Sequence, residues 1–143
     1  MSRDATQRTV DAYLEALFTG GDFGRHFAPD VLWTTMETGE TMRGRETVRD
    51  FIITFHTKTF DAHPQLVHLA VDDGVAAVEA VFLGTQLQEF QGIAASGAEV
   101  RVPYTVFYDV TGDRITALRA YSLTSGIVEQ LRAPQTTGAA MGI

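Results

Sequence analysis

The chain contains no cysteine among its 143 residues. Disulfide bonds, cysteine nucleophiles and thiolate zinc sites are therefore excluded. Basic residues are also scarce, since 11 lysines and arginines stand against 18 aspartates and glutamates, for a net charge of −7. The two signs are interspersed along the sequence. Because nucleic-acid binding needs grouped positive charge, no nucleic-acid partner is expected.

Long apolar runs are lacking as well. The polar start, Met1-Ser2-Arg3-Asp4, does not resemble a signal peptide, and no stretch of about 20 apolar residues follows. We therefore expect no membrane association and a soluble, cytoplasmic protein. Phosphate loops, nucleophile elbows and dinucleotide fingerprints are absent. The four histidines share no ligand spacing, so no metal site and no cofactor is expected.

The length predicts one domain, because a chain of this size can bury roughly two-thirds of its unfolded surface without a metal or disulfide. We place this single domain at residues 1–133 and predict a mobile C-terminal tail at residues 134–143, after Pro134. Apolar spacings of three and four predict helices over residues 6–18 and 45–59, and a shorter one over 124–132. A period of two predicts strands over residues 31–37, 66–71 and 75–88.

The most informative stretch is residues 100–123, in which two β-branched and apolar arms flank the turn formers Thr111-Gly112-Asp113. This pattern predicts a β-hairpin. Alternation along the strands predicts one face with Val100, Val102, Tyr104, Val106 and Tyr108, and with Ile115, Ala117, Arg119, Tyr121 and Leu123. An unpaired arginine in a dry core is costly, so this mixed face is typical of a ligand cavity.

The order of elements, with two helices before a run of antiparallel strands, predicts an α+β fold with helices gathered on one side of a curved sheet. Several short motifs occur in a family-like order: Thr19-Gly20-Gly21-Asp22, Phe27-Ala28-Pro29-Asp30-Val31, Met42-Arg43-Gly44-Arg45-Glu46, Gly84-Thr85-Gln86 and Ile127-Val128-Glu129-Gln130-Leu131. Together they resemble the SnoaL-like polyketide cyclases of the NTF2-like superfamily. The resemblance implies a cone, a curved antiparallel sheet wrapped around N-terminal helices.

The resemblance also implies a chemistry. SnoaL-like cyclases close rings of polyketide esters without a metal, with a carboxylate on the last strand as base and a histidine at the carbonyl oxygen. The carboxylate position corresponds to Leu123 and the histidine position to Gln86. Leucine cannot carry a proton, and glutamine can only donate or accept a hydrogen bond. The family's catalytic pair is thus replaced in this chain.

The steroid isomerases offer a looser resemblance. Their oxyanion tyrosine corresponds to Tyr13, their protonated aspartate to Tyr104 and their basic aspartate to Thr35. Two donors for a developing oxyanion are therefore kept, whereas the base is not. Oxyanion stabilisation is often the largest catalytic contribution, but proton abstraction still needs an acceptor.

Each candidate residue also has an ordinary structural interpretation. Glu37 is either a displaced base or a solvated strand end. Arg119 either clamps a substrate oxygen or pairs with an acid at the rim. His56 is either a general acid or base or a structural histidine at a core edge. The tyrosines Tyr13, Tyr104 and Tyr121 either donate to a ligand or pack in the wall.

We predict one cavity whose polarising groups are Tyr13, Gln86, Tyr104 and Arg119, and whose other ligand-binding residues are Trp33, Thr35, Glu37, His56, Phe82, Tyr121 and Leu123. The first hypothesis is a cyclase-, isomerase- or hydratase-type step on a polyketide-like or polycyclic carbonyl compound of secondary metabolism. The alternative is a binding or accessory protein that has lost catalysis. A third hypothesis is an interaction module that works only as a dimer.

The opposite face of the hairpin also carries apolar residues. Val81, Leu83, Thr105, Phe107, Leu118 and Ala120 are predicted to share this outer face. Monomers rarely expose a large apolar patch. Because both main helices are needed on the inner face, a homodimer joined sheet to sheet is expected.

Overall fold

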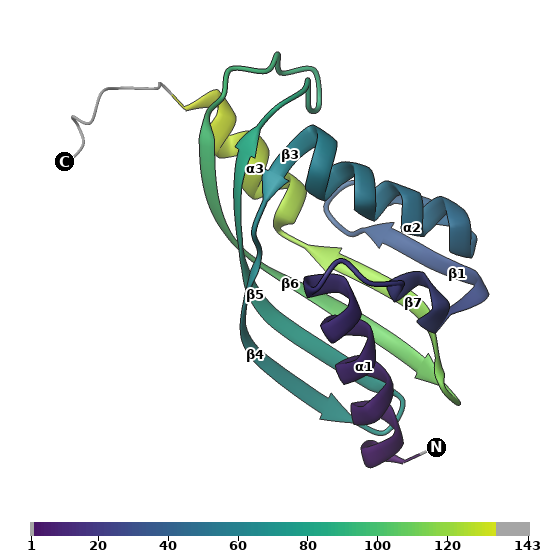
Figure 1. Cartoon of the computed structure of the whole chain (residues 1–143). Helices are drawn as coiled ribbons and strands as arrows, with labels where there is room; N and C mark the ends of the chain where they lie inside the picture. Colours follow the sequence, from purple (N-terminus) through teal and green to yellow (C-terminus); the bar gives the residue numbers. More distant parts are fainter. Residues whose placement is uncertain (1, 134–143) are drawn as a thin grey trace.

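The computed structural model describes residues 2–133, in which three α-helices lie on the concave face of a curved seven-stranded sheet (Figure 1). The sheet order is β2-β1-β7-β6-β5-β3, and β4 also pairs with β5. The strands are β1 (Phe27–Thr35), β2 (Glu40–Arg43), β3 (Phe60–Ala62), β4 (Gln65–Asp72), β5 (Val75–Gln86), β6 (Glu99–Thr111) and β7 (Arg114–Tyr121). The predicted α+β fold, an NTF2-like cone, is confirmed. One feature differs, because β1 and β7 pair in parallel and the sheet is mixed.

The first helix, α1 (Arg3–Phe18), packs against the inner face of the sheet. Its N-terminus is capped by the Ser2 hydroxyl, which accepts a hydrogen bond from the Ala5 amide at 3.0 Å. Past its end, Gly20 has a φ of 74°, the left-handed conformation that glycine adopts most easily. A short 3₁₀ turn, η1 (Phe23–His26), then leads into β1.

The second helix, α2 (Arg45–Thr54), continues as one turn of π-helix, η2 (Phe55–Thr59). Together they occupy the span predicted as one helix. The wider turn carries Phe55 and His56 at the end of α2. Such π-turns inside helices are rare and often occur at functional sites.

Two hydrophobic clusters fill the space between the helices and the sheet. The first joins α1 and α2 to β1, β6 and β7, and the second joins η2, β3 and β5 to α3 (Leu123–Arg132). Close packing of α3 on β6 depends on Gly126, because a Cβ there would collide with the Val102 side chain. Tyr104 packs against both clusters, so their junction lies beside its ring.

The predicted β6–β7 hairpin is confirmed. The prediction of which β7 side chains lie on the inner face of the sheet was wrong. Val110 pairs with Ile115, whereas Asp109 pairs with Ala117, so Thr116 is an extra residue in β7. This β-bulge shifts the alternation of side chains by one. Leu118 and Ala120 therefore lie on the inner face and are buried. Arg119 and Tyr121 lie on the outer face, contrary to the prediction.

On the outer face Arg119 makes a paired contact with Asp109, with nitrogen–oxygen distances of 2.7 and 3.1 Å. Its guanidinium also lies over the Phe107 ring, 5.8 Å from the centroid. These contacts explain why an arginine is stable in this position. The Asp109 hydrogen bond is also the main reason that the pKa of Arg119 is raised.

Two short strands, β2 and β3, were not predicted, since each is only three or four residues long. The predicted tail at residues 134–143 lies outside the described residues. Within residues 2–133, no helix is both long and apolar enough to cross a membrane.

Candidate functional site

A hollow of about 40 Å³, here called the inner hollow, lies where the two hydrophobic clusters meet. Its polar lining consists of three tyrosines and one histidine: Tyr13 from α1, Tyr104 and Tyr108 from β6, and His56 from η2. Apolar groups such as Phe55, Leu118 and Leu123 complete the wall. The inner hollow is thus an apolar space into which a few polar groups converge, the usual form of a small-molecule site.

The three tyrosines present hydroxyl groups that the described part of the protein leaves unpaired. The hydroxyls of Tyr13, Tyr104 and Tyr108 have no hydrogen-bond partner among residues 2–133. Every side-chain nitrogen or oxygen atom that is fully buried in this part of the chain does have a partner. Their hydroxyls must therefore reach open space rather than packed protein. Since all three line the inner hollow, a ligand or solvent in it would receive these donors.

Burial also keeps these phenols protonated. It raises the pKa of Tyr104 to about 12. It also raises the pKa of Tyr13 and Tyr108 well above the ordinary value, with a smaller contribution from the neighbouring phenols. The Tyr13 and Tyr108 rings meet edge to face at 5.5 Å. A phenol that does not ionise near neutral pH acts as a hydrogen-bond donor, for example to a carbonyl oxygen or an enolate.

His56 is the other polar group of the inner hollow. Its Nδ1 lies 2.8 Å from the Ile52 carbonyl oxygen. Because a carbonyl oxygen can only accept, Nδ1 carries the proton and Nε2 has a free lone pair. Burial lowers the pKa of His56, against a smaller opposing effect of the Ile52 hydrogen bond. His56 is therefore a neutral proton acceptor at physiological pH.

Aromatic contacts hold His56 and Tyr104 around the same neighbour. The Phe82 ring lies 6.0 Å from the His56 ring and 6.4 Å from the Tyr104 ring. Phe82 itself is fully buried and stands behind these two groups rather than in the wall of the hollow. The acceptor and one donor thus share a rigid backing, which fixes their relative positions.

The inner hollow has two possible approaches. A side hollow of about 200 Å³ shares Trp33, Phe51, Phe55 and Leu123 with it and adds Thr35 at its margin. An apolar groove of about 520 Å³ between α1 and η2 shares Leu17, Ile52 and His56 with it. His56 therefore stands between the protein surface and the interior.

The structure brings together six of the predicted residues. Tyr13, Tyr104, Trp33, Thr35, His56 and Leu123 line the inner or the side hollow. Tyr108 belongs to the site as well, although it was predicted only as part of the mixed strand face. Its alternation with Tyr104 on β6 was the available signal.

Five predicted residues lie outside the lining of both hollows. One of them is Phe82, which stands behind the wall of the inner hollow. Arg119 and Tyr121 are on the outer face of the sheet because of the bulge in β7. Glu37 follows β1 and accepts a hydrogen bond from the Ser125 amide at 2.9 Å, so it stabilises the first turn of α3. Gln86 is buried on the inner face but points at the loop of residues 87–98.

All side-chain hydrogen bonds of Gln86 go to that loop. Its amide nitrogen donates to the Gln88 and Ile93 carbonyl oxygens at 3.1 and 2.9 Å, and its oxygen accepts from the Ser96 hydroxyl at 3.4 Å. Phe90 and Gln91 of the same loop line the side hollow. Gln86 therefore acts as an anchor that shapes one wall of the site.

Replacing Gln86 with leucine should remove this anchor. The Gln88 carbonyl would lose its donor, whereas the Ile93 carbonyl would keep the Phe90 amide at 3.0 Å. We expect the free energy of unfolding to fall by about 1–3 kcal/mol. Amide hydrogen exchange of residues 87–98 should accelerate at the same time. The matched control is Gln88→Leu, since Gln88 is exposed and its side chain forms no hydrogen bond within residues 2–133. Unchanged exchange in Gln86→Leu would show that other contacts hold the loop.

Within residues 2–133, no group of three histidine and carboxylate side chains is arranged to hold a metal ion. The inner hollow contains no carboxylate in its lining either. What it offers is one neutral nitrogen base and several protonated phenols. Such a set can accept a proton from carbon while donating hydrogen bonds to an adjacent oxygen.

Comparison with known proteins identifies a matching sequence family and structures with the same fold. The sequence model of the SnoaL-like domain family matches residues 10–118. No curated protein sequence matches the chain. Among solved structures, a candidate SnoaL-like polyketide cyclase from Jannaschia sp. CCS1 is 17% identical, with a TM-score of 0.79 over 92% of this chain and 94% of that one.

Two further structures show the same fold. A candidate polyketide cyclase from Xanthomonas campestris pv. campestris is 23% identical, with a TM-score of 0.74 over 90% of this chain and 98% of that one. A protein with a ketosteroid isomerase-like fold from Catenulispora acidiphila, solved in complex with trimethylamine, is 22% identical. Its TM-score is 0.68 over 90% of this chain and 95% of that one. At these identities the likeness establishes the fold and leaves the chemistry to the site.

Proposed function

The chain belongs to the SnoaL-like domain family, and on that premise we propose that it binds a small cyclic carbonyl compound and moves a proton next to the carbonyl group. The inner and side hollows receive the ligand. His56 Nε2 takes a proton from the carbon beside the carbonyl. The hydroxyls of Tyr13 and Tyr104 donate to the oxygen as it becomes an enolate. Returning the proton at another position, or attack of the enolate on a second carbonyl, gives an isomerase- or cyclase-type outcome.

The observation that carries this proposal is the pairing of one proton acceptor with unpaired, protonated phenols around a single hollow. By the family resemblance, the carboxylate position corresponds to Leu123, so on this proposal the base comes from another element. His56 meets the requirement from the π-turn, because its tautomer is fixed by the Ile52 carbonyl. The hollows measure about 40 and 200 Å³, which favours a compound of one or two fused rings over a large polycycle.

Hydrogen–deuterium exchange tests the proposal without knowledge of the natural substrate. The probe is 2-tetralone, a fused two-ring ketone with acidic protons beside its carbonyl. In deuterium oxide the wild-type protein should accelerate the loss of these protons, followed by NMR, above the buffer rate and above the rate with thermally unfolded protein. Binding of 2-tetralone without faster exchange would contradict a proton-transfer function.

A non-catalytic binding protein is the second candidate. Leu123 supports it, because Leu123 lines both hollows and the family resemblance assigns the base to this position. On this alternative, His56 would only hydrogen-bond the ligand. The exchange experiment separates the two, since a binding protein retains affinity for the ketone but leaves its exchange rate unchanged.

The pH dependence of the exchange should reflect His56. Its lowered pKa keeps the imidazole neutral, and therefore basic, below its ordinary value of about 6.5. We expect kcat/KM to stay level from about pH 8 to about pH 6.5 and to decline only below that, as His56 takes up a proton. Tyr104, with a pKa of about 12, should add no alkaline decline below about pH 10. An acid decline that begins above pH 6.5 would argue against His56.

We also propose that two copies associate through the outer face of the sheet. Phe107 and Tyr121 are 36% and 37% exposed there and pack edge to face at 5.8 Å. The half-buried Val81 and Leu83 lie farther along the sheet, opposite Pro103 and Arg101. Phe107→Glu should convert the dimer to a monomer in sedimentation experiments, because it would bury a carboxylate of each copy in the contact between them. Thr57→Glu, on the exposed side of η2, is the control. A monomeric wild type at micromolar concentration would refute the association.

A further inference from the structure

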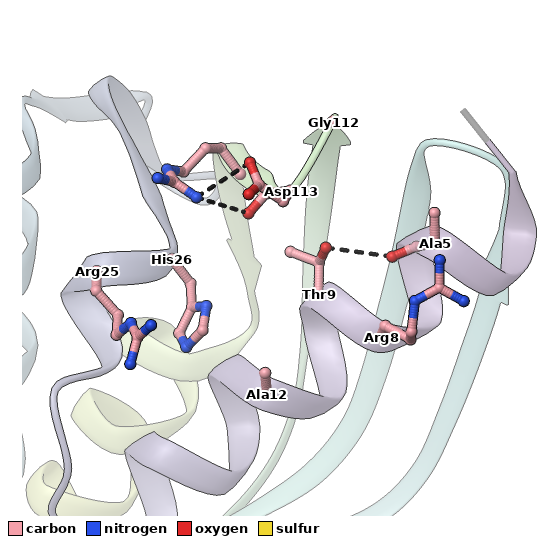
Figure 2. Close-up of a pocket in the computed structure, with 9 residues that line it drawn as sticks. Ala5, Arg8, Thr9, Ala12, Arg25, His26, Gly112 and Asp113 are labelled. Carbon is pink, nitrogen blue, oxygen red and sulfur yellow. Dashed lines mark hydrogen bonds and ion pairs between the residues drawn. The ribbon is translucent and has the colours of Figure 1, made fainter.

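A second depression lies on the surface, outside the site described above. It is an open groove of about 710 Å³ between α1, η1 and the turn that joins β6 to β7 (Figure 2). Its floor is made of short side chains, Ala5, Thr9, Ala12 and Gly112. Because these side chains are short, the surface is hollowed between the longer groups at the rim. We call this depression the arginine groove.

Basic side chains from three separate elements surround the arginine groove. Arg8 comes from α1, Arg25 and His26 come from η1, and Arg114 is the first residue of β7. Figure 2 shows Arg25 and His26 next to each other on one side of Ala12, with Arg8 on the other side. One carboxylate, Asp113, also lines the groove. The whole chain has 18 acidic and 11 basic residues. The lining of the arginine groove shows the opposite balance, with three arginines and one acidic residue.

Two of these guanidinium groups are available to a ligand. Arg8 and Arg25 form no ion pair or side-chain hydrogen bond within the described residues, whereas Arg114 pairs with Asp113 at 3.0 Å. Most other arginines are engaged, as in the Arg45 contact with the Phe27 carbonyl and the Arg119 contact with Asp109. Exposed guanidinium groups are planar forks that bind phosphate oxygens two at a time.

We propose that the arginine groove binds the diphosphate group of a small molecule. Cations contributed by three separate elements suit an anion that carries oxygens on two phosphorus atoms better than a single phosphate. Among the described residues, no phenylalanine, tyrosine or tryptophan lines the groove, so recognition rests mainly on the charged group. Free diphosphate and a diphosphate ester share this chemistry.

His26 provides an internal reporter of the bound anion. Burial lowers its pKa, and the charges of Arg25 and Arg114 lower it further, against smaller effects of Asp22 and Asp113. An anion held by the same arginines would offset their repulsion. The pKa of His26 should therefore rise when the groove is filled. His68, exposed on β4 and outside the groove, should not respond.

The test is calorimetric titration with inorganic diphosphate at low ionic strength, combined with NMR titration of His26 and His68. Arg8→Gln and Arg25→Gln should each lower the affinity about tenfold, since each removes a charge-assisted contact. Arg132→Gln, an exposed arginine of α3, is the charge-matched control and should bind as the wild type does. Both groove positions are exposed, so thermal unfolding should be unchanged in each variant.

Three results would overturn the proposal: no heat of binding with the wild type, equal losses in Arg25→Gln and Arg132→Gln, or orthophosphate binding as tightly as diphosphate. The second would show attraction by overall charge, and the third a site for a single phosphate. A comparison of inorganic diphosphate with a methyl diphosphate ester then separates the sources. Equal affinities indicate that the protein recognises only the diphosphate group. Weaker binding of the ester indicates a site for free diphosphate.

Discussion

Replacing His56 with glutamine should reduce the protein-catalysed exchange of 2-tetralone by roughly 10²–10⁴-fold, the usual contribution of a general base. Glutamine keeps much of the size of the side chain and can still hydrogen-bond, but it cannot hold a proton taken from carbon. Among the described residues that line the inner hollow, the Nε2 lone pair of His56 is the one nitrogen base, and no carboxylate stands beside it. The side hollow adds one carboxylate, Glu40.

Two controls make this result specific. His68→Gln removes an exposed histidine of β4 that lines neither hollow, and it should leave the exchange rate unchanged. Thermal unfolding of His56→Gln should show that the fold persists. If His56→Gln folds, binds the ketone and still exchanges its protons at the wild-type rate, the base lies elsewhere.

The second large effect concerns stability. Phe82→Ala should lower the free energy of unfolding by about 3–5 kcal/mol, the cost of deleting a fully buried aromatic ring and leaving a cavity. The Phe82 ring contacts Phe55 and Phe60 with centroid distances of 5.2 and 5.4 Å, besides backing His56 and Tyr104. Its loss would therefore loosen the supports of the site as well as the second hydrophobic cluster.

Denaturant unfolding followed by Trp33 fluorescence measures this change. Leu87→Ala is the matched control, because Leu87 is 48% exposed at the end of β5 and its truncation should cost little. A loss below about 1 kcal/mol in Phe82→Ala would mean that the neighbouring rings collapse into the space, and that Phe82 is not the rigid backing described above.

The main helices and strands could be predicted because their patterns are long. The spacing of Val10, Tyr13, Leu14 and Leu17 places them on one face of α1, and three of them are buried while Leu17 packs at the edge of the core. The strands β2 and β3 could not be predicted, since three or four residues carry too little periodicity. Their pairing is decided by neighbours that are distant in sequence, such as Gly84 opposite Ala62.

The site residues could be predicted only where side chains alternate regularly between the two faces of a strand. Tyr104 and Tyr108 lie on one uninterrupted face of β6, and both reach the inner hollow. Beyond the turn, the extra residue Thr116 reverses the facing of Arg119 and Tyr121, and no local signal in the sequence announces a bulge. Likewise, the partner of Glu37 is the amide of Ser125, 88 residues away, which strand periodicity cannot reveal.

The most direct test of the proposed site is a crystal structure with 2-naphthol, a planar phenol that resembles the enol of 2-tetralone. The naphthol oxygen is predicted to lie about 2.6–3.2 Å from the hydroxyl of Tyr13 or Tyr104, with the adjacent ring carbon facing His56 Nε2. Naphthol bound outside the inner and side hollows would contradict the account, as would an oxygen that contacts neither tyrosine.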